Sequence, residues 1–443
     1  MTIRTIVVCA LLIISHGVLH ASELTAKQQL GSAIFVDRTL SLNRNQGCVN
    51  CHSPNTGWTG DIAEFNEHGA AYEGSVKQRL GNRKPPSAAY ATNSPVLYYD
   101  KKEELFIGGN FWDGRATGEK LGNPAADQAQ GPFVNPVEHA LPDHACVVYK
   151  VCHAHYPVSL DKVWPGACDI QWPPNVKTAC TTEGITVTLG PNERAKVDKA
   201  YDFVGLAIAD FEASPALNAF TSKYDYYLAG RVSLTQEEER GMKLFKDKGQ
   251  CDACHPMDPG KHGEPPLFTD YSYDNLGVPR NPENPWYKMP KRFNPDGRQW
   301  VDKGLGAFLE TRADYKQFAN TNYGKHKVPT VRNVDKRSSA DFVKAYMHNG
   351  YFKSLKGLVH FYNTRDIKPA CNNPHTTEVD ALAQQCWPAA EIADNVNKEE
   401  LGDLKLTAEE EAAIVAFMKT LSDGYVPPKG TPLLMPGPRR KGK

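Results

Sequence analysis

The sequence predicts a mainly α-helical protein of two domains, with long ordered loops and one disulfide-stapled insertion. Two similar segments predict the domains, because each starts with Leu-Thr, continues as a charged amphipathic helix, reaches a Phe and ends in Cys-x-x-Cys-His. The insertion is predicted at residues 139–190, which are rich in Pro, Cys and His and show poor helical periodicity. Residues 256–340 contain many Pro, Gly and Asn residues, which indicates ordered loops.

Three helix starts have the same form, a Leu-Thr pair in which the Thr is the N-cap. They lie at Leu24-Thr25, Leu234-Thr235 and Leu406-Thr407, and in the last two a Glu stands three residues after the Thr, as in a capping box. The third helix is expected to run to about Leu421, before Gly424 and two prolines. Residues 194–230 are also expected to be helical, since the apolar residues of LAIADFEAS recur at helical spacing.

Composition restricts the class of protein. The 443 residues allow two or three domains, and a hydrophobic content of 40% is enough for a buried core. Lys and Arg together number 51, as do Asp and Glu, and this neutral balance argues against nucleic-acid binding. The expected domains are residues 22–230 and 231–425, followed by a flexible tail at 426–443 that is rich in Pro, Gly and Lys.

Residues 1–21 are predicted to be a secretory signal peptide. Arg4 is followed by an apolar run from Ile6 to Ile14, which is too short to span a bilayer, and Ala21 suits the position before cleavage. No other stretch approaches about 18 consecutive apolar residues, so we expect an exported protein without a membrane span.

The 11 cysteines fall into three groups. Cys9 lies in the signal peptide, and four cysteines belong to the two Cys-x-x-Cys-His motifs. The other six are Cys146, Cys152, Cys168, Cys180, Cys371 and Cys386. An even number in an exported protein favours disulfides, with Cys371–Cys386 indicated by its short loop and the other four pairing among themselves. A metal site is the alternative, since His153 and His155 follow Cys152.

Each Cys-x-x-Cys-His motif predicts one covalently attached haem c, with two thioether bonds and an axial His. The residues involved are Cys48, Cys51 and His52, and Cys251, Cys254 and His255. A zinc site fails as the alternative, because the motifs lie far apart and each carries a His directly after its second Cys. The two predicted domains are therefore cytochrome c-type haem domains. An open iron would make a catalyst, whereas two strong ligands would make an electron carrier.

The chain resembles the bacterial dihaem cytochrome c peroxidase family, which includes the MauG branch. The resemblance runs from about Leu24 to Gly424, apart from the insertion, and rests on five motifs. They are FWDGR at 111–115, QAQGP at 128–132, NPVE at 135–138, VPTVRNV at 328–334 and YMHNG at 346–350. The resemblance implies a peroxidase-type oxidoreductase with two covalently bound haem c groups, located in the periplasm.

Several residues take roles from this resemblance. Trp112 matches a tryptophan that lies between the haems and carries electrons, although it could serve as a core aromatic as well. Gln128 and Glu138 match the pair over the first haem, where hydrogen peroxide binds, and Pro132 matches a proline packed on that face. A carboxylate there can take a proton from the near oxygen of peroxide and give it to the far one.

The distal ligand of the second haem separates the subtypes of the family. Ordinary peroxidases have a Met fourteen residues after the His of the YMHNG motif, and counting from His348 gives Tyr362. MauG-like members resemble this chain in having Tyr there. A phenolate favours oxidised iron, so Tyr362 implies a haem that stores oxidising equivalents as high-valent iron. Met347 is the competing ligand, which would make an ordinary high-potential haem, and His360 is a weaker one.

His68 bears on the state of the first haem. It stands at the offset from His52 where ordinary peroxidases of the family have a removable distal ligand, a gate that MauG-like members lack. An exposed loop His is the interpretation that we prefer for it.

The family also holds a structural calcium ion between its domains, through an Asn side chain and backbone carbonyls. In this chain Lys84 stands at the Asn position, with Asn82 two residues away. Carbonyls near Val343 and Ala345 would complete the site, but a cation at Lys84 would oppose calcium.

The leading hypothesis is a periplasmic MauG-like enzyme that uses hydrogen peroxide to oxidise a partner protein, at Trp or Tyr side chains. The second is a conventional peroxidase fed by a small redox protein, which predicts His68 and Met347 as ligands. The third is a non-catalytic electron carrier, which has no use for Gln128 and Glu138. The insertion is the expected docking element for the partner.

Overall fold

The computed structural model describes residues 24–260 and 263–434. The predicted signal peptide and the end of the predicted tail lie outside the described residues. The helices are α1 (Ala26–Val36), α2 (Ala63–Glu67), α3 (Pro124–Val134), α4 (His144–Cys152), α5 (Leu160–Val163), α6 (Val176–Ala179), α7 (Pro191–Glu212), α8 (Lys223–Leu228), α9 (Gln236–Lys246), α10 (Gly304–Glu310), α11 (Leu355–Thr364), α12 (Glu378–Gln384) and α13 (Ala408–Lys419). The strands are β1 (Tyr98–Asp100), β2 (Leu105–Ile107), β3 (Tyr273–Asp274) and β4 (His326–Lys327).

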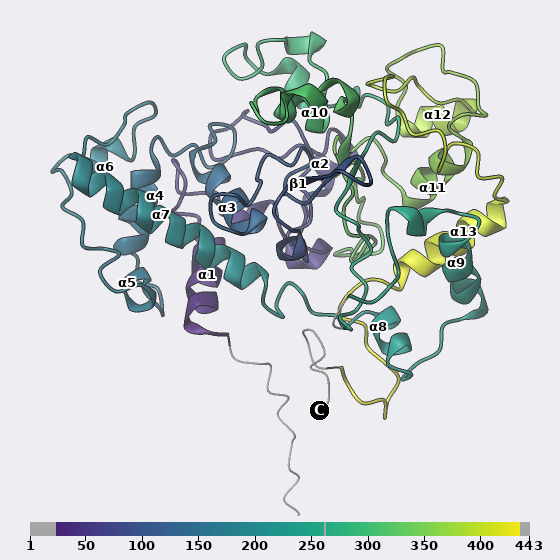
Figure 1. Cartoon of the computed structure of the whole chain (residues 1–443), viewed down its shortest axis with the longest axis horizontal. Helices are drawn as coiled ribbons and strands as arrows, with labels where there is room; N and C mark the ends of the chain where they lie inside the picture. The colour runs from purple at the N-terminus through teal and green to yellow at the C-terminus, as the bar shows by residue number, and fades with distance from the viewer. Residues whose placement is uncertain (1–23, 261–262, 435–443) are drawn as a thin grey trace, which may run out of the picture.

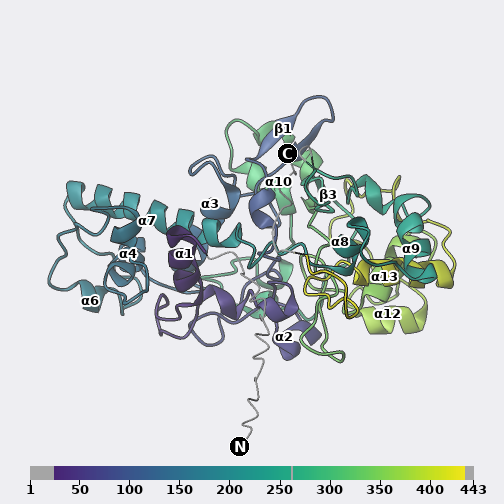
Figure 2. The ribbon, with the colours of Figure 1, turned by 90° about the horizontal axis from the view of Figure 1, so that it is seen from below.

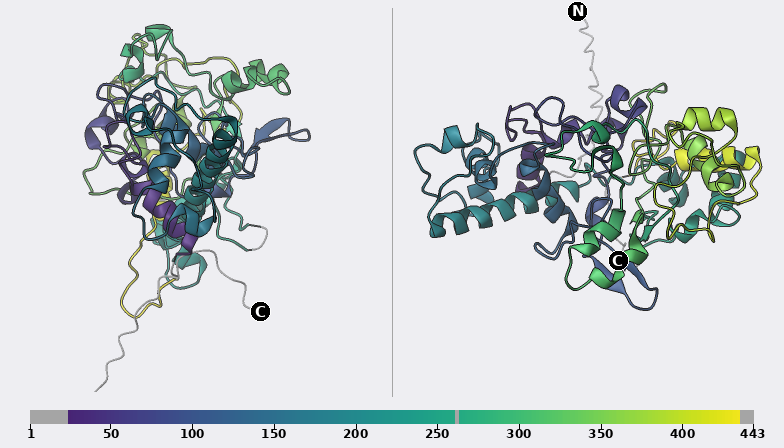
Figure 3. Two further views of the ribbon diagram at one scale, coloured as in Figure 1. Left: turned by 90° about the vertical axis from the view of Figure 1, so that its left-hand side faces the viewer. Right: turned by 90° about the horizontal axis from the view of Figure 1, so that it is seen from above.

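The helices gather in two lobes at opposite ends of the long axis. One lobe holds α1 and α4–α7, and the other holds α9 and α11–α13 (Figure 1). Loops fill the region between them, and α10 and β1 project from the middle of the molecule in the view from below (Figure 2). Seen from above, the lobes remain on either side of this region (Figure 3). In the described part, strands form only the antiparallel pairs β1–β2 and β3–β4, which confirms a mainly α protein.

The first lobe is built on the crossing of α1 and α7. Thr25 caps α1 in a reciprocal capping box with Gln28, as the Leu-Thr start predicted. At the crossing, a Cβ added to Gly31 would lie 1.9 Å from the carbonyl oxygen of Ala207, so only glycine lets the helices approach this closely. Phe35, one turn further along α1, is buried in the core of this lobe.

The second lobe repeats this arrangement with α9 and α13. Thr235 and Thr407 both form the predicted capping boxes. A Cβ on Gly241 would lie 1.8 Å from the carbonyl oxygen of Ala413, and Phe245 follows one turn later. Each half therefore contains two helices that cross at a glycine. In each half the first of these helices also carries a buried Phe one turn after the glycine, before the Cys-x-x-Cys-His motif.

Residues 139–190 were predicted to be an insertion with little helix, and the prediction of little helix was wrong. It contains α4, α5 and α6, and Val147, Val148 and Leu160 are fully buried in the core of the first lobe. Its helical period was not visible because buried residues occur on most sides of α4. Part of the predicted docking element is therefore core structure.

The disulfide prediction is confirmed. The described bonds are Cys146–Cys180, Cys152–Cys168 and Cys371–Cys386, while the four cysteines of the two motifs remain free. The alternative of a metal site at Cys152 is thereby wrong, because a disulfide sulfur is not available as a thiolate ligand.

Two segments refine the predicted layout. Tyr224 and Tyr227 of α8 pack with the core of the second lobe, so this short helix joins the C-terminal half although it precedes residue 231. The region predicted as loops contains α10, whose Leu305 and Leu309 pack with Phe106 of β2 in a small separate core. No helix in the described residues combines the length and the apolar character needed to cross a bilayer.

A buried ion pair holds the segment before the second lobe. Arg332 is fully buried and donates to Asp225 at 3.0 and 3.1 Å and to the Pro266 carbonyl at 2.6 Å. Removing one partner leaves an uncompensated buried charge, so Arg332→Met should lower the free energy of unfolding by about 3–5 kcal/mol. Urea denaturation measures this loss, and a double variant that also replaces Asp225 by Leu should recover part of it. A loss below about 1 kcal/mol, the value of an exposed pair, would contradict this account.

Candidate haem sites

Two large cavities lie in the loop region, one beside each Cys-x-x-Cys-His motif. Their empty volumes, which include space open to solvent, are about 1130 and 1150 Å³. The first is lined by Cys48, Cys51 and His52, and the second by Cys251, Cys254 and His255. Each predicted set of attachment residues therefore faces its own cavity, as covalent attachment of a haem requires.

Both histidines are oriented in the same way. The Nδ1 atom of His52 lies 3.1 Å from the carbonyl oxygen of Trp58, and that of His255 lies 2.9 Å from the carbonyl oxygen of Phe268. Because a carbonyl only accepts, Nδ1 must carry the proton and Nε2 keeps its lone pair. This carbonyl contact is the usual partner of a metal-bound imidazole, so both rings fit as iron ligands.

The four motif cysteines are enclosed, and burial is the first cause of their high pKa values. The pKa of Cys51 rises to about 12, helped by Glu138, and that of Cys251 also rises to about 12. The thiols are therefore held in an enclosed, poorly solvated position beside each cavity.

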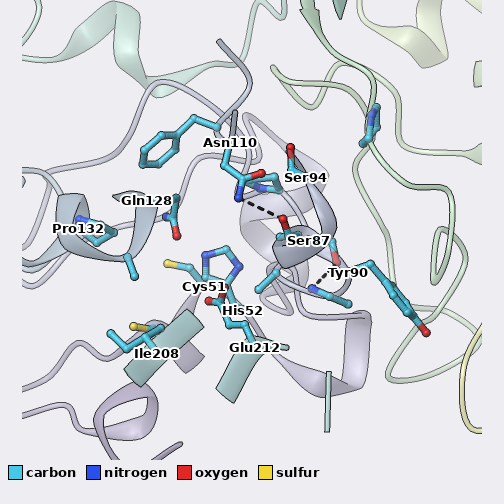
Figure 4. Close-up of a pocket in the computed structure, with 18 of the residues that line it drawn as sticks. Cys51, His52, Ser87, Tyr90, Ser94, Asn110, Gln128, Pro132, Ile208 and Glu212 are labelled. Carbon is cyan, nitrogen blue, oxygen red and sulfur yellow. Dashed lines mark hydrogen bonds between the residues drawn. The ribbon is translucent and has the colours of Figure 1, made fainter. Parts of the chain in front are cut away.

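The wall of the first cavity contains the predicted peroxide-site residues. Gln128 and Pro132 stand four residues apart on α3, so their side chains share one face of the helix (Figure 4). Glu138 lies just beyond α3, where its Oε1 accepts a hydrogen bond of 2.8 Å from the Asn135 side chain. The structure thus brings all three residues to one cavity.

The Glu138 side chain is partly buried and lines the first cavity. Burial raises the pKa of Glu138, against the opposing effects of Arg115 and the Asn135 hydrogen bond. A raised pKa makes the carboxylate a better proton acceptor, which suits acid–base chemistry on peroxide.

Trp112 lies between the cavities and contributes to the lining of both. Its indole Nε1 donates to the Lys84 carbonyl at 2.8 Å, and its ring meets that of His348 at a centroid distance of 6.4 Å. The neighbouring Asp113 is held by Arg83 and Arg115 at 2.6 Å each, which fixes the turn of the FWDGR motif. This position agrees with the role that the resemblance implied for Trp112.

Tyr362 and Met347 both line the second cavity, so both candidate ligands are near the second motif. Burial raises the pKa of Tyr362. Cys254 and then Cys251 raise this pKa further, because these attachment thiols lie near the phenol hydroxyl. His360 contacts Glu411 at 2.9 Å instead and is not part of this wall.

A stacked pair of histidines also lines the second cavity. The rings of His326 and His348 are 3.5 Å apart and nearly parallel, and the buried Nε2 atoms of both lack a partner within the described chain. Asp302 lies 3.3 Å from His326, but Arg83 already binds this carboxylate with two bonds of 2.6 Å. The Nδ1 atom of His326 lies 3.0 Å from the carbonyl oxygen of Gly324, so the proton of a neutral ring is on Nδ1 and Nε2 keeps its lone pair. One ligand atom each of Asp302, His326 and His348 lies within 4.8 Å of the others.

Sequence reasoning missed three groups in these cavities. Lys327 lines both cavities, and His326 precedes it directly. Both residues come just before the VPTVRNV motif, and this position was the only indication of their importance in the sequence. Glu212 is buried in the first cavity, where burial raises its pKa to about 8. Glu212 stands four residues after Ile208 and so shares the buried face of α7 with it. An acidic residue on an apolar helix face is unusual, and this was the signal in the sequence that could have identified Glu212.

His68 does not reach the first cavity. Its ring is largely exposed, and Nδ1 lies 3.0 Å from the carboxylate of Glu283. This agrees with an exposed loop His and leaves the distal side of the first cavity to Gln128, Pro132 and Glu138.

The residues around Lys84 do not fit a calcium ion. The buried ammonium of Lys84 stands where the Asn ligand was expected, and the carbonyl of Val343 already accepts the Asn66 amide at 3.2 Å. The carbonyl of Asn82 accepts the Asn284 amide at 2.9 Å. Calcium prefers anionic and carbonyl oxygen ligands, whereas an ammonium group here would repel it.

Two oriented histidines in separate cavities, joined by a tryptophan, define a dihaem peroxidase-type oxidoreductase. The family model for di-haem cytochrome c peroxidase matches residues 25–233. The chain is 31% identical to the methylamine utilization protein MauG of Paracoccus denitrificans over 397 residues, which cover 89% of this chain and 88% of MauG. The chain therefore belongs to the di-haem cytochrome c peroxidase/MauG family, whose cofactor is a pair of haem c groups.

Other relatives agree with this assignment. Cytochrome c551 peroxidase of Pseudomonas aeruginosa is 27% identical over 337 residues, which cover 75% of this chain and 70% of that protein. The crystal structure of the diheme peroxidase BthA from Burkholderia thailandensis superposes with a TM-score of 0.68 at 25% identity, covering 93% of this chain and 90% of BthA.

Proposed function

We propose that this protein is a periplasmic, MauG-like dihaem enzyme that uses hydrogen peroxide to oxidise a partner protein, at Trp or Tyr side chains. One observation carries the proposal: Tyr362 lines the second cavity at the position where ordinary peroxidases of the family have a Met. A phenolate stabilises an oxidised iron, which suits a site that retains oxidising equivalents until a partner arrives.

The first cavity would bind and cleave peroxide. Haem, when attached at Cys48 and Cys51, supplies the iron that accepts peroxide and takes up its two oxidising equivalents. His52 would be the protein ligand of this haem, with its Nδ1 proton donated to the Trp58 carbonyl. Gln128 orients the peroxide through its amide. Glu138 takes the proton from the near oxygen and returns it to the far oxygen, which leaves as water.

The residues between the cavities would connect the two sites. Trp112 borders both cavities and offers a short aromatic path for electrons. Lys327 borders both as well and donates to the Ser94 hydroxyl at 3.0 Å. His255 and Tyr362, which both line the second cavity, would be the protein ligands of the second haem.

A conventional peroxidase is the second candidate, because Met347 lines the same cavity as Tyr362. The two functions differ in what the fully oxidised protein does with peroxide. In the MauG-like enzyme, one equivalent of hydrogen peroxide should promptly remove the ferric EPR and absorption features of both haems. A conventional peroxidase with a closed first haem would show no change until one haem had been reduced, and that result would reject the proposal.

A further inference from the structure

Two lysine side chains are buried at the junction between the N-terminal and C-terminal halves. Lys84 is 9% exposed and its Nζ donates to the Thr59 hydroxyl at 3.0 Å and to the Pro85 carbonyl at 3.2 Å. Lys344 is 4% exposed, and among the described residues neither ammonium has a carboxylate at ion-pair distance. Buried charges are normally paired, so two such groups close together need a structural reason.

Lys344 is held by three carbonyl oxygens. They belong to Thr56 at 2.8 Å, Asn333 at 2.8 Å and Lys336 at 3.0 Å, so one comes from the N-terminal half and two from the C-terminal half. Burial and the nearby Lys84 lower the pKa of Lys344. The geometry nonetheless requires the ammonium, because a neutral amine has only two N–H groups and would turn a lone pair toward the third carbonyl.

The backbone of Lys84 joins the same two halves. Its N–H donates to the His348 carbonyl at 2.8 Å, and its carbonyl accepts the indole N–H of Trp112 at 2.8 Å. Lys84 therefore fixes the position of Trp112 relative to the second cavity, while its side chain is anchored to the loop after the first Cys-x-x-Cys-His motif.

We propose that the ammonium groups of Lys84 and Lys344 replace a bound metal cation between the two halves, so that the Trp112 connection forms without calcium. Lys84 occupies the place of the expected ligand, and Lys344 stands between the two expected carbonyl donors, Val343 and Ala345. A divalent ion there would meet two positive charges, and neither ammonium has a carboxylate within ion-pair distance among the described residues, although Asp335 acts on Lys344 from further away. Both lysines act as positioning residues, through the loops that they hold.

The first test uses the intact protein with both haems attached. After dialysis against a calcium chelator or against calcium chloride, plasma mass spectrometry should find no stoichiometric calcium in either sample. The peroxide-driven change at each haem should proceed at the same rate in both. One retained calcium ion per chain, or a slower change at the second haem after chelation, would overturn the proposal. The calcium content does not depend on the partner or on which reaction the enzyme catalyses, whereas the rate at the second haem rests on the proposed function.

The second test removes each charge. Lys84→Met and Lys344→Met should keep both haems and the reaction of the first haem with peroxide, but the response of the second haem should slow severalfold. Added calcium should not restore it, whereas Lys344→Arg, which keeps the charge, should retain most of it. Lys223→Met is the matched control, since Lys223 pairs with Glu238 inside the C-terminal half. A second-haem response at the wild-type rate in both Met variants would show that the ammonium groups are dispensable.

Discussion

Glu138→Gln is expected to slow the reaction with hydrogen peroxide by about 10²–10⁴-fold, the usual contribution of a positioned acid–base group. The amide keeps the size of the side chain and its contact with Asn135, but it cannot take the proton from the near oxygen of peroxide. The stopped-flow rate of the first-haem absorption change measures the loss. Haem content should stay at two per chain, because the attachment residues are unchanged.

The pH dependence gives an independent check on Glu138. Burial raises its pKa, so the ionised form that accepts the proton is present above that pKa and is lost as the pH falls through it. The wild-type rate should therefore decline on the acid side, and Glu138→Gln should lack this decline. Glu67→Gln, at an exposed position of α2, should behave as the wild type. An acid limb that persists in Glu138→Gln would assign the proton transfer to another group, with Glu212 as the first to examine.

Tyr362→Met is expected to convert the second site to the ordinary peroxidase type. Thioether ligation favours reduced iron, so the reduction potential of the second haem should rise by the order of tenths of a volt, within the span of about 0.8 V that axial ligands produce. Peroxide added to the fully ferric variant should no longer remove the features of the second haem. Potentiometric titration followed by optical spectroscopy measures the first effect, and EPR measures the second.

Met347→Leu is the matched control for the second site, because Met347 lines the same cavity. If Tyr362 is the ligand, the Leu variant should keep the wild-type spectrum and potential of the second haem. A changed spectrum in Met347→Leu with an unchanged one in Tyr362→Met would identify Met347 as the ligand and favour the conventional peroxidase.

Much of the fold was predictable because its signals are local. A capping box involves residues three apart, so Thr25, Thr235 and Thr407 could be recognised from the sequence alone. The closure of Cys371–Cys386 was predictable for the same reason, since its loop is short. The helices at 139–190 were missed because a helix buried on most sides has no amphipathic period to read.

The candidate site was predictable in its parts but not in its connections. The residue types and spacing of the two Cys-x-x-Cys-His motifs indicated two haem c groups, and the family motifs led to Trp112, Gln128, Glu138 and Tyr362. Lys327 could not be assigned, because its importance comes from bordering both cavities, which are formed by segments from the two halves.

The sequence by itself therefore determined the cofactor attachment, the helix starts and the type of chemistry, since each depends on residues close together in the chain. Only the tertiary structure showed the Gly31 and Gly241 crossings, the stacking of His326 on His348, and the two buried ammonium groups of Lys84 and Lys344. These features depend on contacts between segments that are far apart in sequence. Their physical consequences, which are close backbone approach, buried ring nitrogens without a hydrogen bond and repulsion of a metal cation, exist only once the chain has folded.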